Sequence, residues 1–331
     1  MQPSLEAHTQ ASDDPEVRAA LEACRGMIRK GSKSFSLASL LFSERTQEAA
    51  FSLYGWCRHC DDQVDEASDD STRNARLEEL RWATSGAFGV QSDGSSKARV
   101  STLSVFVALR HVAGRYGIPE AYARDLIEGM AMDARGERYE SLSELELYAY
   151  RVAGAVGLMM SHIMGVSDVR ALRHACDLGI AMQLSNIARD VLADAALGRV
   201  YLPLSWLREE GIPDPTPASV ADPDQRDRVA RVVGRLLEAA DQRYRSGNQG
   251  LPYLAWRSAL ACSAASSVYC QIGHAVRRRG KRAWDRRTVV PTGLKLLALA
   301  RGVFRVFLTI PSRLARPWSR VQLPGTWRYT S

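Results

Sequence analysis

Residues 183–194 read QLSNIARDVLAD, and this stretch decides the fold. Its polar members Asn186, Asp190 and Asp194 recur every four residues, so on a helix they stack in one column. Apolar neighbours such as Ile187 flank the column, which indicates a helix face turned into the protein. Stacked amide and carboxylate oxygens suit Mg²⁺ or Mn²⁺, which often bind substrate phosphates too. The stretch therefore predicts a helical protein with a metal site for a diphosphate.

A second acidic stretch, YGWCRHCDDQVD, occupies residues 54–65. On a helix, Tyr54, Arg58, Asp61 and Asp65 form one stripe. Taken alone, a solvated helix face with local ion pairs explains this stripe as well as a ligand site does. Two acids one turn apart repel each other, so two such stripes in one chain favour a cation between them. We expect the two acidic helices to face each other across a central cavity.

Helical periodicity dominates the rest of the chain, with no alternation typical of strands. A chain of 331 residues that is 46% hydrophobic can bury one large core. The expected fold class is therefore all-α, a single helical domain. We expect a disordered N-terminus at 1–15, a catalytic domain at 16–293 and a basic amphipathic segment at 294–331.

Positive charge is concentrated at the C-terminal end. Residues 276–331 hold 14 Lys/Arg and one acid, and the remainder is net negative. The two partners that this charge suggests are an anionic membrane surface and nucleic acid. We expect no nucleic acid partner, because the charge lies in a tail and not on a core face with interleaved stacking aromatics. Three cations within residues 294–310 argue against a spanning helix and favour an amphipathic helix on the bilayer. A final core helix with a frayed basic tail explains the segment equally well.

The first fifteen residues are polar, and the six cysteines show no framework. Both features are typical of a protein of the reducing cytoplasm. We therefore expect a cytoplasmic protein that contacts the inner face of the membrane.

Four stretches together resemble the squalene/phytoene synthase family of head-to-head prenyl transferases: residues 31–35, 54–65, 150–157 and 183–203. The resemblance covers most of the chain and implies an isoprenoid synthase fold. It implies that Mg²⁺ or Mn²⁺ is held by Asp61, Asp65, Asn186, Asp190 and Asp194. The sequence departs from the family at Gly31, which can be histidine in relatives, and at Leu192-Ala193, which often reads Gly-Glu.

Further site residues are carried over from the same resemblance. Diphosphate contacts are implied at Ser32, Lys33, Arg58, Arg189 and Arg287, and prenyl-chain contacts at Phe35, Ser39 and Gln183. The reaction centre is implied at Tyr54, Tyr150, Arg199, Tyr201 and Tyr269. Asp133 also matches a family position, and we interpret it as a supporting or structural residue.

The resemblance implies a reaction as well. Two geranylgeranyl diphosphates would condense head to head into a cyclopropyl diphosphate and then into phytoene, in carotenoid biosynthesis, without a nicotinamide cofactor such as NADPH. One alternative is a thirty-carbon enzyme that makes squalene or dehydrosqualene from farnesyl diphosphate. Another is a non-catalytic lipid-binding relative, and the complete set of metal ligands argues against it.

Overall fold

The computed structural model describes residues 14–31, 39–89, 103–166, 168–311 and 329, and every regular element among them is helical. The all-α prediction is therefore confirmed. The helices are α2 (Pro15–Gly31), α4 (Glu44–Asp65), α5 (Asp70–Ala87), α6 (Ser104–Tyr116), α7 (Glu120–Ala134), α8 (Leu142–Ala149), α9 (Ala155–Ile163), α10 (Val169–Ala196), α11 (Leu204–Glu209), α12 (Pro217–Ala221), α13 (Arg226–Gln249), α14 (Trp256–Arg279) and α15 (Thr292–Phe307).

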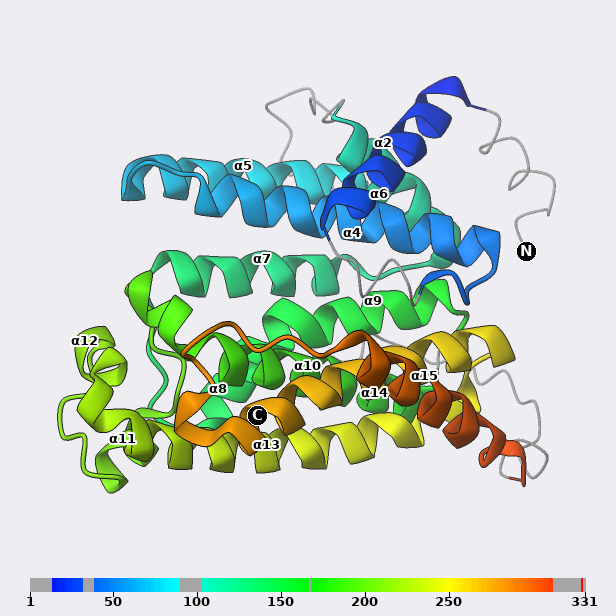
Figure 1. Cartoon of the computed structure of the whole chain (residues 1–331). Helices are drawn as coiled ribbons and strands as arrows, with labels where there is room; N and C mark the ends of the chain where they lie inside the picture. The colour runs from blue at the N-terminus through cyan, green and yellow to red at the C-terminus, as the bar shows by residue number, and fades with distance from the viewer. Residues whose placement is uncertain (1–13, 32–38, 90–102, 167, 312–328, 330–331) are drawn as a thin grey trace.

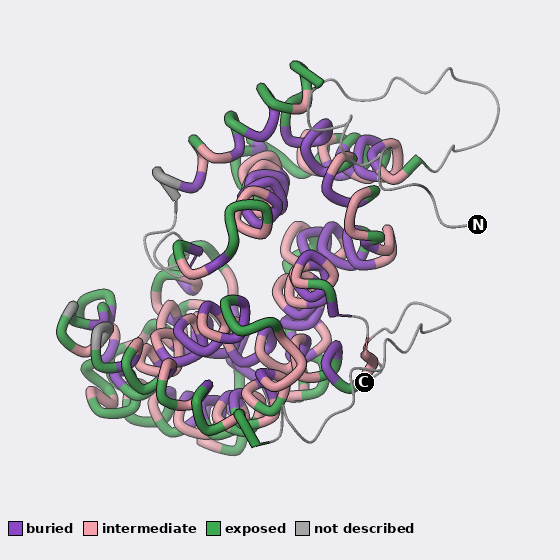
Figure 2. The backbone as a smooth tube through the Cα atoms, turned by 90° about the vertical axis from the view of Figure 1, so that its right-hand side faces the viewer, coloured by how far each residue is buried: buried purple, intermediate pink, exposed green. Residues whose placement is uncertain are grey.

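The long helices form a layered bundle. Helices α4 and α5 lie in one outer layer, α7 and α9 in the middle, and α10, α13 and α14 on the opposite side (Figure 1). Helix α10 packs against α9, α13 and α14, so it lies at the centre of this side of the bundle. The buried residues lie mainly on the faces that the helices turn toward one another (Figure 2). Each acidic stretch thus ends up on a different layer of the bundle.

Helix α10 separates its apolar face from its polar column. Leu184, Ile187 and Ala188 are buried, whereas Asn186 and Asp190 are only half-buried. This is the pattern of a helix that packs on one side and faces an open site on the other. The predicted column on residues 183–194 is therefore present in the folded chain.

The stretch at 150–157 packs unusually close to α10. Residues Tyr150–Gly154 form a π-helix between α8 and α9, a feature often found at functional sites. A Cβ atom on Gly157 would lie 2.6 Å from the carbonyl oxygen of Ala175, and one on Gly179 would lie 2.5 Å from that of Ala153. These glycines let the two backbones touch, which fixes α10 and its acids against the middle layer.

Helix α15 has two different faces. Gly302 and Val306 pack inward, and the Ser263 hydroxyl of α14 donates to the Gly302 carbonyl at 2.9 Å. Leu297, Phe304 and Leu308 point outward and are 47%, 64% and 65% exposed. The segment is therefore a helix that packs on α14 and also has an apolar outer face. No helix within the described ranges is long and apolar enough to cross a bilayer.

Candidate functional site

The first acidic stripe lies at the C-terminal end of α4. Arg58 donates from Nη1 to Oδ2 of Asp61 at 3.2 Å and from Nε to Oδ2 of Asp62 at 3.1 Å. Their side chains are between one third and one half exposed, so solvent reaches this stripe. Arg58 therefore neutralises part of the local negative charge, and Asp62, four residues after Arg58, is a partner outside the predicted stripe.

The second stripe lies near the C-terminal end of α10. Arg189 donates from Nε to Oδ1 of Asp190 at 2.9 Å, and the Nε of Arg287 lies 3.5 Å from the same oxygen. Asn186 donates from Nδ2 to Oε1 of Gln183 at 3.4 Å. The predicted residues Gln183, Asn186, Arg189 and Asp190 therefore gather on one part of the helix.

One ion pair joins the two stripes across 134 positions of sequence. Nη2 of Arg199, in the segment after α10, donates to Oδ1 of Asp65 on α4 at 3.1 Å. Burial opposes the guanidinium charge, but neighbouring Tyr201, Asp133 and Asp65 raise the pKa of Arg199 above its usual range. Arg199 is therefore a fixed cation between the two acidic helices, as a residue of the predicted site should be.

Asp133 of α7 lies at the centre of this arrangement. Tyr201 donates to its Oδ1 at 2.7 Å, and Tyr148 donates to its Oδ2 at 2.8 Å. Burial raises the pKa of Asp133, the two tyrosine hydrogen bonds lower it, and the charge of Asp65 raises it again. Asp133 thus belongs to the acid group and holds two tyrosines in place, which supports its interpretation as a supporting residue.

The acids of the two stripes repel one another. Such repulsion indicates that a cation between them would be stabilised. Burial and then Asp190 raise the pKa of Asp194 to about 7, with a further contribution from Asp133. Burial and then Asp65 raise the pKa of Asp61. The four arginines named above leave the charge of these acids incompletely balanced. Hard oxygen ligands with unbalanced negative charge fit Mg²⁺ or Mn²⁺.

The acids are not drawn together as a closed metal cage. Within the described ranges, the only three His, Cys, Asp or Glu ligand atoms that lie within 4.8 Å of one another belong to a different group, Asp241, Cys270 and His274. Mg²⁺ usually binds through one or two carboxylates, waters and substrate phosphates rather than in an all-protein cage. A Mg²⁺ site of this kind does not require the protein acids to meet one another.

Two of the predicted tyrosines lie near the charged groups. Burial raises the pKa of Tyr54 on α4; the charge of Arg58 lowers this pKa, and Tyr269 raises it. Burial also raises the pKa of Tyr269 on α14, and the charge of Arg189 lowers it. The three helices α4, α10 and α14 therefore bring Tyr54, Tyr269 and Arg189 close to one another.

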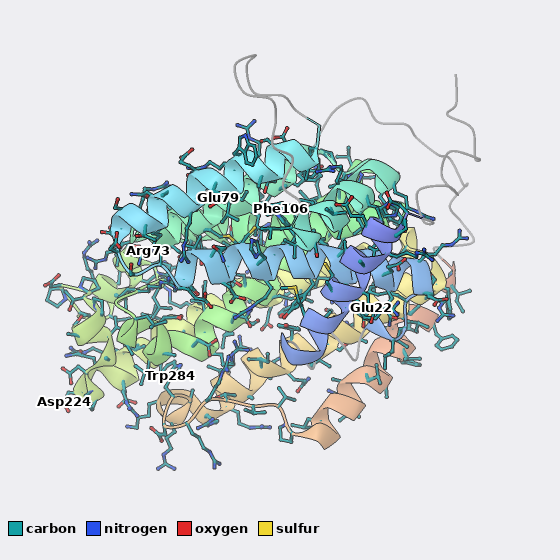
Figure 3. The ribbon with its side chains drawn as sticks, turned by 90° about the horizontal axis from the view of Figure 1, so that it is seen from above. Glu22, Arg73, Glu79, Phe106, Asp224 and Trp284 are labelled. Carbon is teal, nitrogen blue, oxygen red and sulfur yellow. The ribbon has the colours of Figure 1, made fainter. Side chains whose placement is uncertain are left out.

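The loop after α14 is fastened to α10. Trp284, labelled in Figure 3, donates from Nε1 to the carbonyl oxygen of Ala188 at 3.1 Å. This anchor holds the following residues near Asp190, and it explains how Arg287 reaches that carboxylate. The Arg287 side chain is 71% exposed and so is free to turn toward a ligand.

Some predicted residues lie elsewhere or cannot be placed. Tyr150 is buried; its hydroxyl donates to Oδ2 of Asp125 at 2.5 Å, and its ring stacks on Tyr329 at 5.2 Å between centroids. Ser39 is 1% exposed. Ser32, Lys33 and Phe35 lie outside the described residues.

Tyr148, which was not among the predicted residues, also contacts the acid group. Its hydroxyl donates to Asp133, and its ring stacks on Tyr201 at 5.1 Å between centroids. Both tyrosines reach α7, because Tyr150 donates to Asp125, eight residues before Asp133. Only the tertiary contacts show which acid each tyrosine binds.

We expect Tyr201→Phe to lower kcat about 10–100-fold, the usual scale for losing an outer partner of a functional carboxylate. The reason is that Asp133 would lose one of two hydrogen bonds that hold it. Tyr139→Phe is the matched control, because this ring packs beside Tyr148 and Tyr201 while its hydroxyl has no hydrogen-bond partner among the described residues. The measurement is kcat of the two variants by steady-state kinetics. Equal kcat values in Tyr201→Phe and Tyr139→Phe would show that the Tyr201 hydroxyl has no role in the site.

The fold and the two facing acidic helices define a class of helical enzyme that processes prenyl diphosphates. Residues 28–294 match the family model described as squalene/phytoene synthase, and the chain belongs to this family. The chain is 43% identical to the 15-cis-phytoene synthase of Enterobacter agglomerans over 86% of this chain and 95% of that protein. It is 41% identical to the 15-cis-phytoene synthase of Pantoea ananas over 88% and 94% of the two chains.

The solved structures agree with the fold. A dehydrosqualene synthase in complex with ligand superposes with a TM-score of 0.75 and 26% identity, over 90% of this chain and 98% of that one. The squalene synthase HpnC from Alicyclobacillus acidocaldarius gives a TM-score of 0.70, also at 26% identity, over 80% of this chain and 95% of that one. The predicted isoprenoid synthase fold is therefore confirmed.

Proposed function

We propose that this chain is a prenyltransferase of the phytoene synthase type, which condenses two geranylgeranyl diphosphates head to head in carotenoid biosynthesis. The observation that carries the proposal is the pair of acidic stripes on α4 and α10, bridged by Arg199 and Asp65. The similarity to two 15-cis-phytoene synthases at 41–43% identity supports the reaction type.

The side chains have distinct roles in this proposal. Asp61, Asp65, Asn186, Asp190 and Asp194 would hold Mg²⁺ or Mn²⁺, which when bound supplies Lewis-acid activation of the diphosphate. Arg58, Arg189 and Arg287 bind diphosphate oxygens and neutralise the charge of the leaving group. Tyr54 and Tyr269 present aromatic faces to the allylic cation, an interaction of about 0.5–2 kcal/mol for each well-placed ring. An apolar cavity would keep water from this cation.

The substrate chain length separates the proposal from its alternative. A thirty-carbon enzyme would use farnesyl diphosphate, as the resemblance to dehydrosqualene synthase allows. The higher identity to phytoene synthases favours the twenty-carbon substrate. The test is incubation of the purified chain with each diphosphate and Mg²⁺, followed by mass analysis of the hydrocarbon. A forty-carbon product supports the proposal; a thirty-carbon product alone replaces it with the alternative.

The Ser39→Phe variant should shift substrate preference from geranylgeranyl toward farnesyl diphosphate. Ser39 is small and fully buried, so a phenyl ring at this position must displace neighbouring side chains or the bound prenyl chain. Overpacking costs about 1–3 kcal/mol unless a shorter ligand relieves it. The measurement is the ratio of kcat/KM for the two substrates, with Ser39→Ala as the control that adds no bulk. An unmoved ratio in Ser39→Phe would show that Ser39 does not limit the prenyl pocket.

We further propose that the outer face of α15 contacts an anionic membrane surface. Exposed Leu297, Phe304 and Leu308 provide the apolar side, and exposed Arg301 lies among them. A helix with this composition lies in the interface with its apolar face toward the acyl chains. Lipid substrates and products make such a position useful, since they partition into the bilayer.

Replacing Leu297, Phe304 and Leu308 together with serine should reduce co-sedimentation with anionic liposomes several-fold. These residues point away from the core, so the folded chain should persist, whereas deleting the whole segment would uncover α14. Leu103→Ser, at a comparably exposed leucine before α6, is the control. Raised salt should weaken binding of the unmodified chain. If neither the triple substitution nor raised salt reduces co-sedimentation, this face is not the membrane contact.

A further inference from the structure

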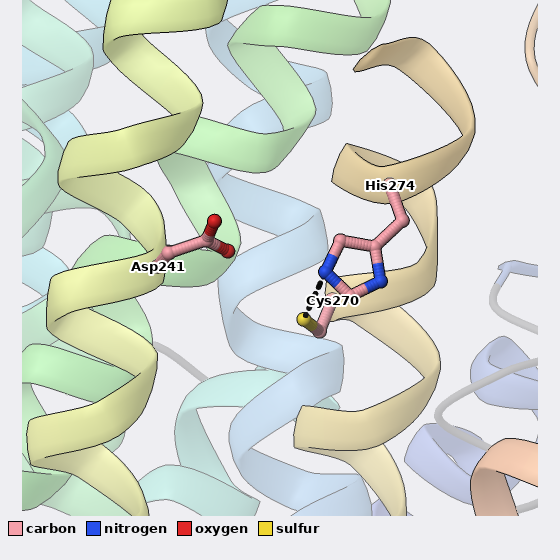
Figure 4. A group of neighbouring side chains, drawn as sticks. All are labelled: Asp241, Cys270 and His274. Carbon is pink, nitrogen blue, oxygen red and sulfur yellow. Dashed lines mark hydrogen bonds between the residues drawn. The ribbon is translucent and has the colours of Figure 1, made fainter. Parts of the chain in front are cut away.

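A second group of metal-ligating side chains lies outside the acidic site. Asp241 extends from α13, and Cys270 and His274 extend from α14 (Figure 4). One ligand atom from each lies within 4.8 Å of the other two. None of the three belongs to the diphosphate site described above, and Asp241 and Cys270 are half-buried whereas His274 is exposed.

The packing of α13 on α14 explains why these residues meet. A Cβ atom on Gly273 would lie 2.9 Å from Cδ2 of Leu237, so the absence of a side chain there lets the helices approach closely. Asp241 follows Leu237 by one helical turn, and Cys270 precedes His274 by one turn on the facing helix. The close approach therefore brings one carboxylate to a Cys-His pair that already shares a helix face.

The distance within the Cys-His pair fits a tetrahedral metal ion. Sγ of Cys270 lies 3.6 Å from Nε2 of His274. Zn–S and Zn–N bonds of about 2.3 and 2.0 Å at a tetrahedral angle separate sulfur and nitrogen by about 3.5 Å. The two ligands are thus already spaced for one ion, and the carboxylate completes three protein ligands with a fourth position for water.

Charged side chains of both signs surround the three ligands. Nη1 of Arg277 donates to Oδ2 of Asp241 at 3.0 Å, which orients the carboxylate in the way that outer partners orient metal ligands. A thiolate and a carboxylate supply two negative charges to the ion, and Arg277 and Arg305 add positive charge beside them. We propose that Asp241, Cys270 and His274 form a site for a thiophilic divalent cation such as Zn²⁺, which links α13 to α14.

Proton release follows from this assignment. Burial and then Asp241 raise the pKa of the Cys270 thiol, while Arg305 of α15 and Arg277 lower it. Metal binding requires the thiolate, so each ion bound displaces a proton and affinity increases with pH. The hard cation Mg²⁺ prefers oxygen ligands and should not compete for this site.

Cobalt(II) is the probe for the test, because its bond to a thiolate gives a charge-transfer absorption. The full chain is titrated with Co²⁺ in excess Mg²⁺, which occupies the acidic site. We expect one Co²⁺ per chain with thiolate absorption, displaced by Zn²⁺. Cys270→Ser should abolish the absorption, and His274→Ala should weaken binding at least tenfold. Cys262→Ser, two turns earlier on α14, should leave both the thiolate absorption and the Co²⁺ affinity unchanged. Absorption that persists in Cys270→Ser, or none in the unmodified chain, overturns the proposal.

A second measurement uses only the unmodified chain and so does not depend on the folding of a variant. Zn²⁺ should slow alkylation of Cys270 at least tenfold and leave alkylation of half-buried Cys262 unchanged, as read by peptide mass analysis. Equal protection of both cysteines, or of neither, contradicts the assignment. Because the readouts are metal binding and thiol protection, the result is independent of which prenyl diphosphate the enzyme uses.

Discussion

Replacing Asp61 or Asp190 with alanine should lower turnover by a thousandfold or more and leave the helical fold intact. Each change removes a proposed metal ligand from one of the two stripes. Without it, the diphosphate loses charge stabilisation at the moment it leaves, the largest single contribution to such a reaction. The measurement is the rate of hydrocarbon formation under saturating Mg²⁺.

Stability should change little in these variants. Burial and Asp65 raise the pKa of Asp61, which shows that its charge is disfavoured in the metal-free protein, so its removal relieves repulsion. Asp190 is paired with Arg189, but Arg189 can then turn to Asp194, one of the charges around it. Glu22→Ala, at an exposed ion pair on α2, is the control for a lost carboxylate. Metal-dependent turnover within tenfold of wild type in either site variant would refute the assignment.

Arg189→Ala should slow the reaction by roughly two to three powers of ten, the scale of removing one charge-stabilising group. The Arg189 side chain is 16% exposed and lies between Asp190 and Tyr269. It is therefore a fixed cation beside Asp190, where we propose that the leaving diphosphate gains charge. Steady-state kinetics with a labelled substrate measures the effect on both kcat and KM.

The matched control for this variant is Arg25→Ala, which removes an arginine paired with Glu22 on the surface of α2. It should leave kcat and KM unchanged. If Arg189→Ala behaves like this control, Arg189 lies outside the site. If it raises KM alone, the residue binds substrate and transition state equally and contributes nothing to ionisation.

Much of the fold was predictable because helix periodicity is local. The spacing of Asn186, Asp190 and Asp194 predicted one helix face, and that face is the half-buried side of α10. Segment 211–223 is rich in proline, a composition typical of a loop, yet Thr216 and Ser219 form a capping box that starts the short helix α12 within it. Pro217 occupies the first position of this helix, where its missing N–H and fixed φ favour the helix.

The candidate site was predictable only in part, because some of its contacts join distant positions. Asp61 and Asp65 follow from local spacing, but the pair of Arg199 with Asp65 spans two layers and has no local pattern. Asp133 belongs to the site because it accepts hydrogen bonds from two tyrosines of other segments. The contact of Tyr148 with Asp133 of α7 likewise has no local pattern in the sequence.

The central claim is that the two acidic stripes together bind a metal-complexed diphosphate. The most direct test is anomalous diffraction from crystals grown with Mn²⁺ and a non-hydrolysable geranylgeranyl diphosphate analogue. We predict Mn²⁺ between the diphosphate and the carboxylates of both stripes, Asp61 and Asp65 on α4 and Asp190 and Asp194 on α10. A diphosphate bound without Mn²⁺ contacts to either stripe would contradict the account.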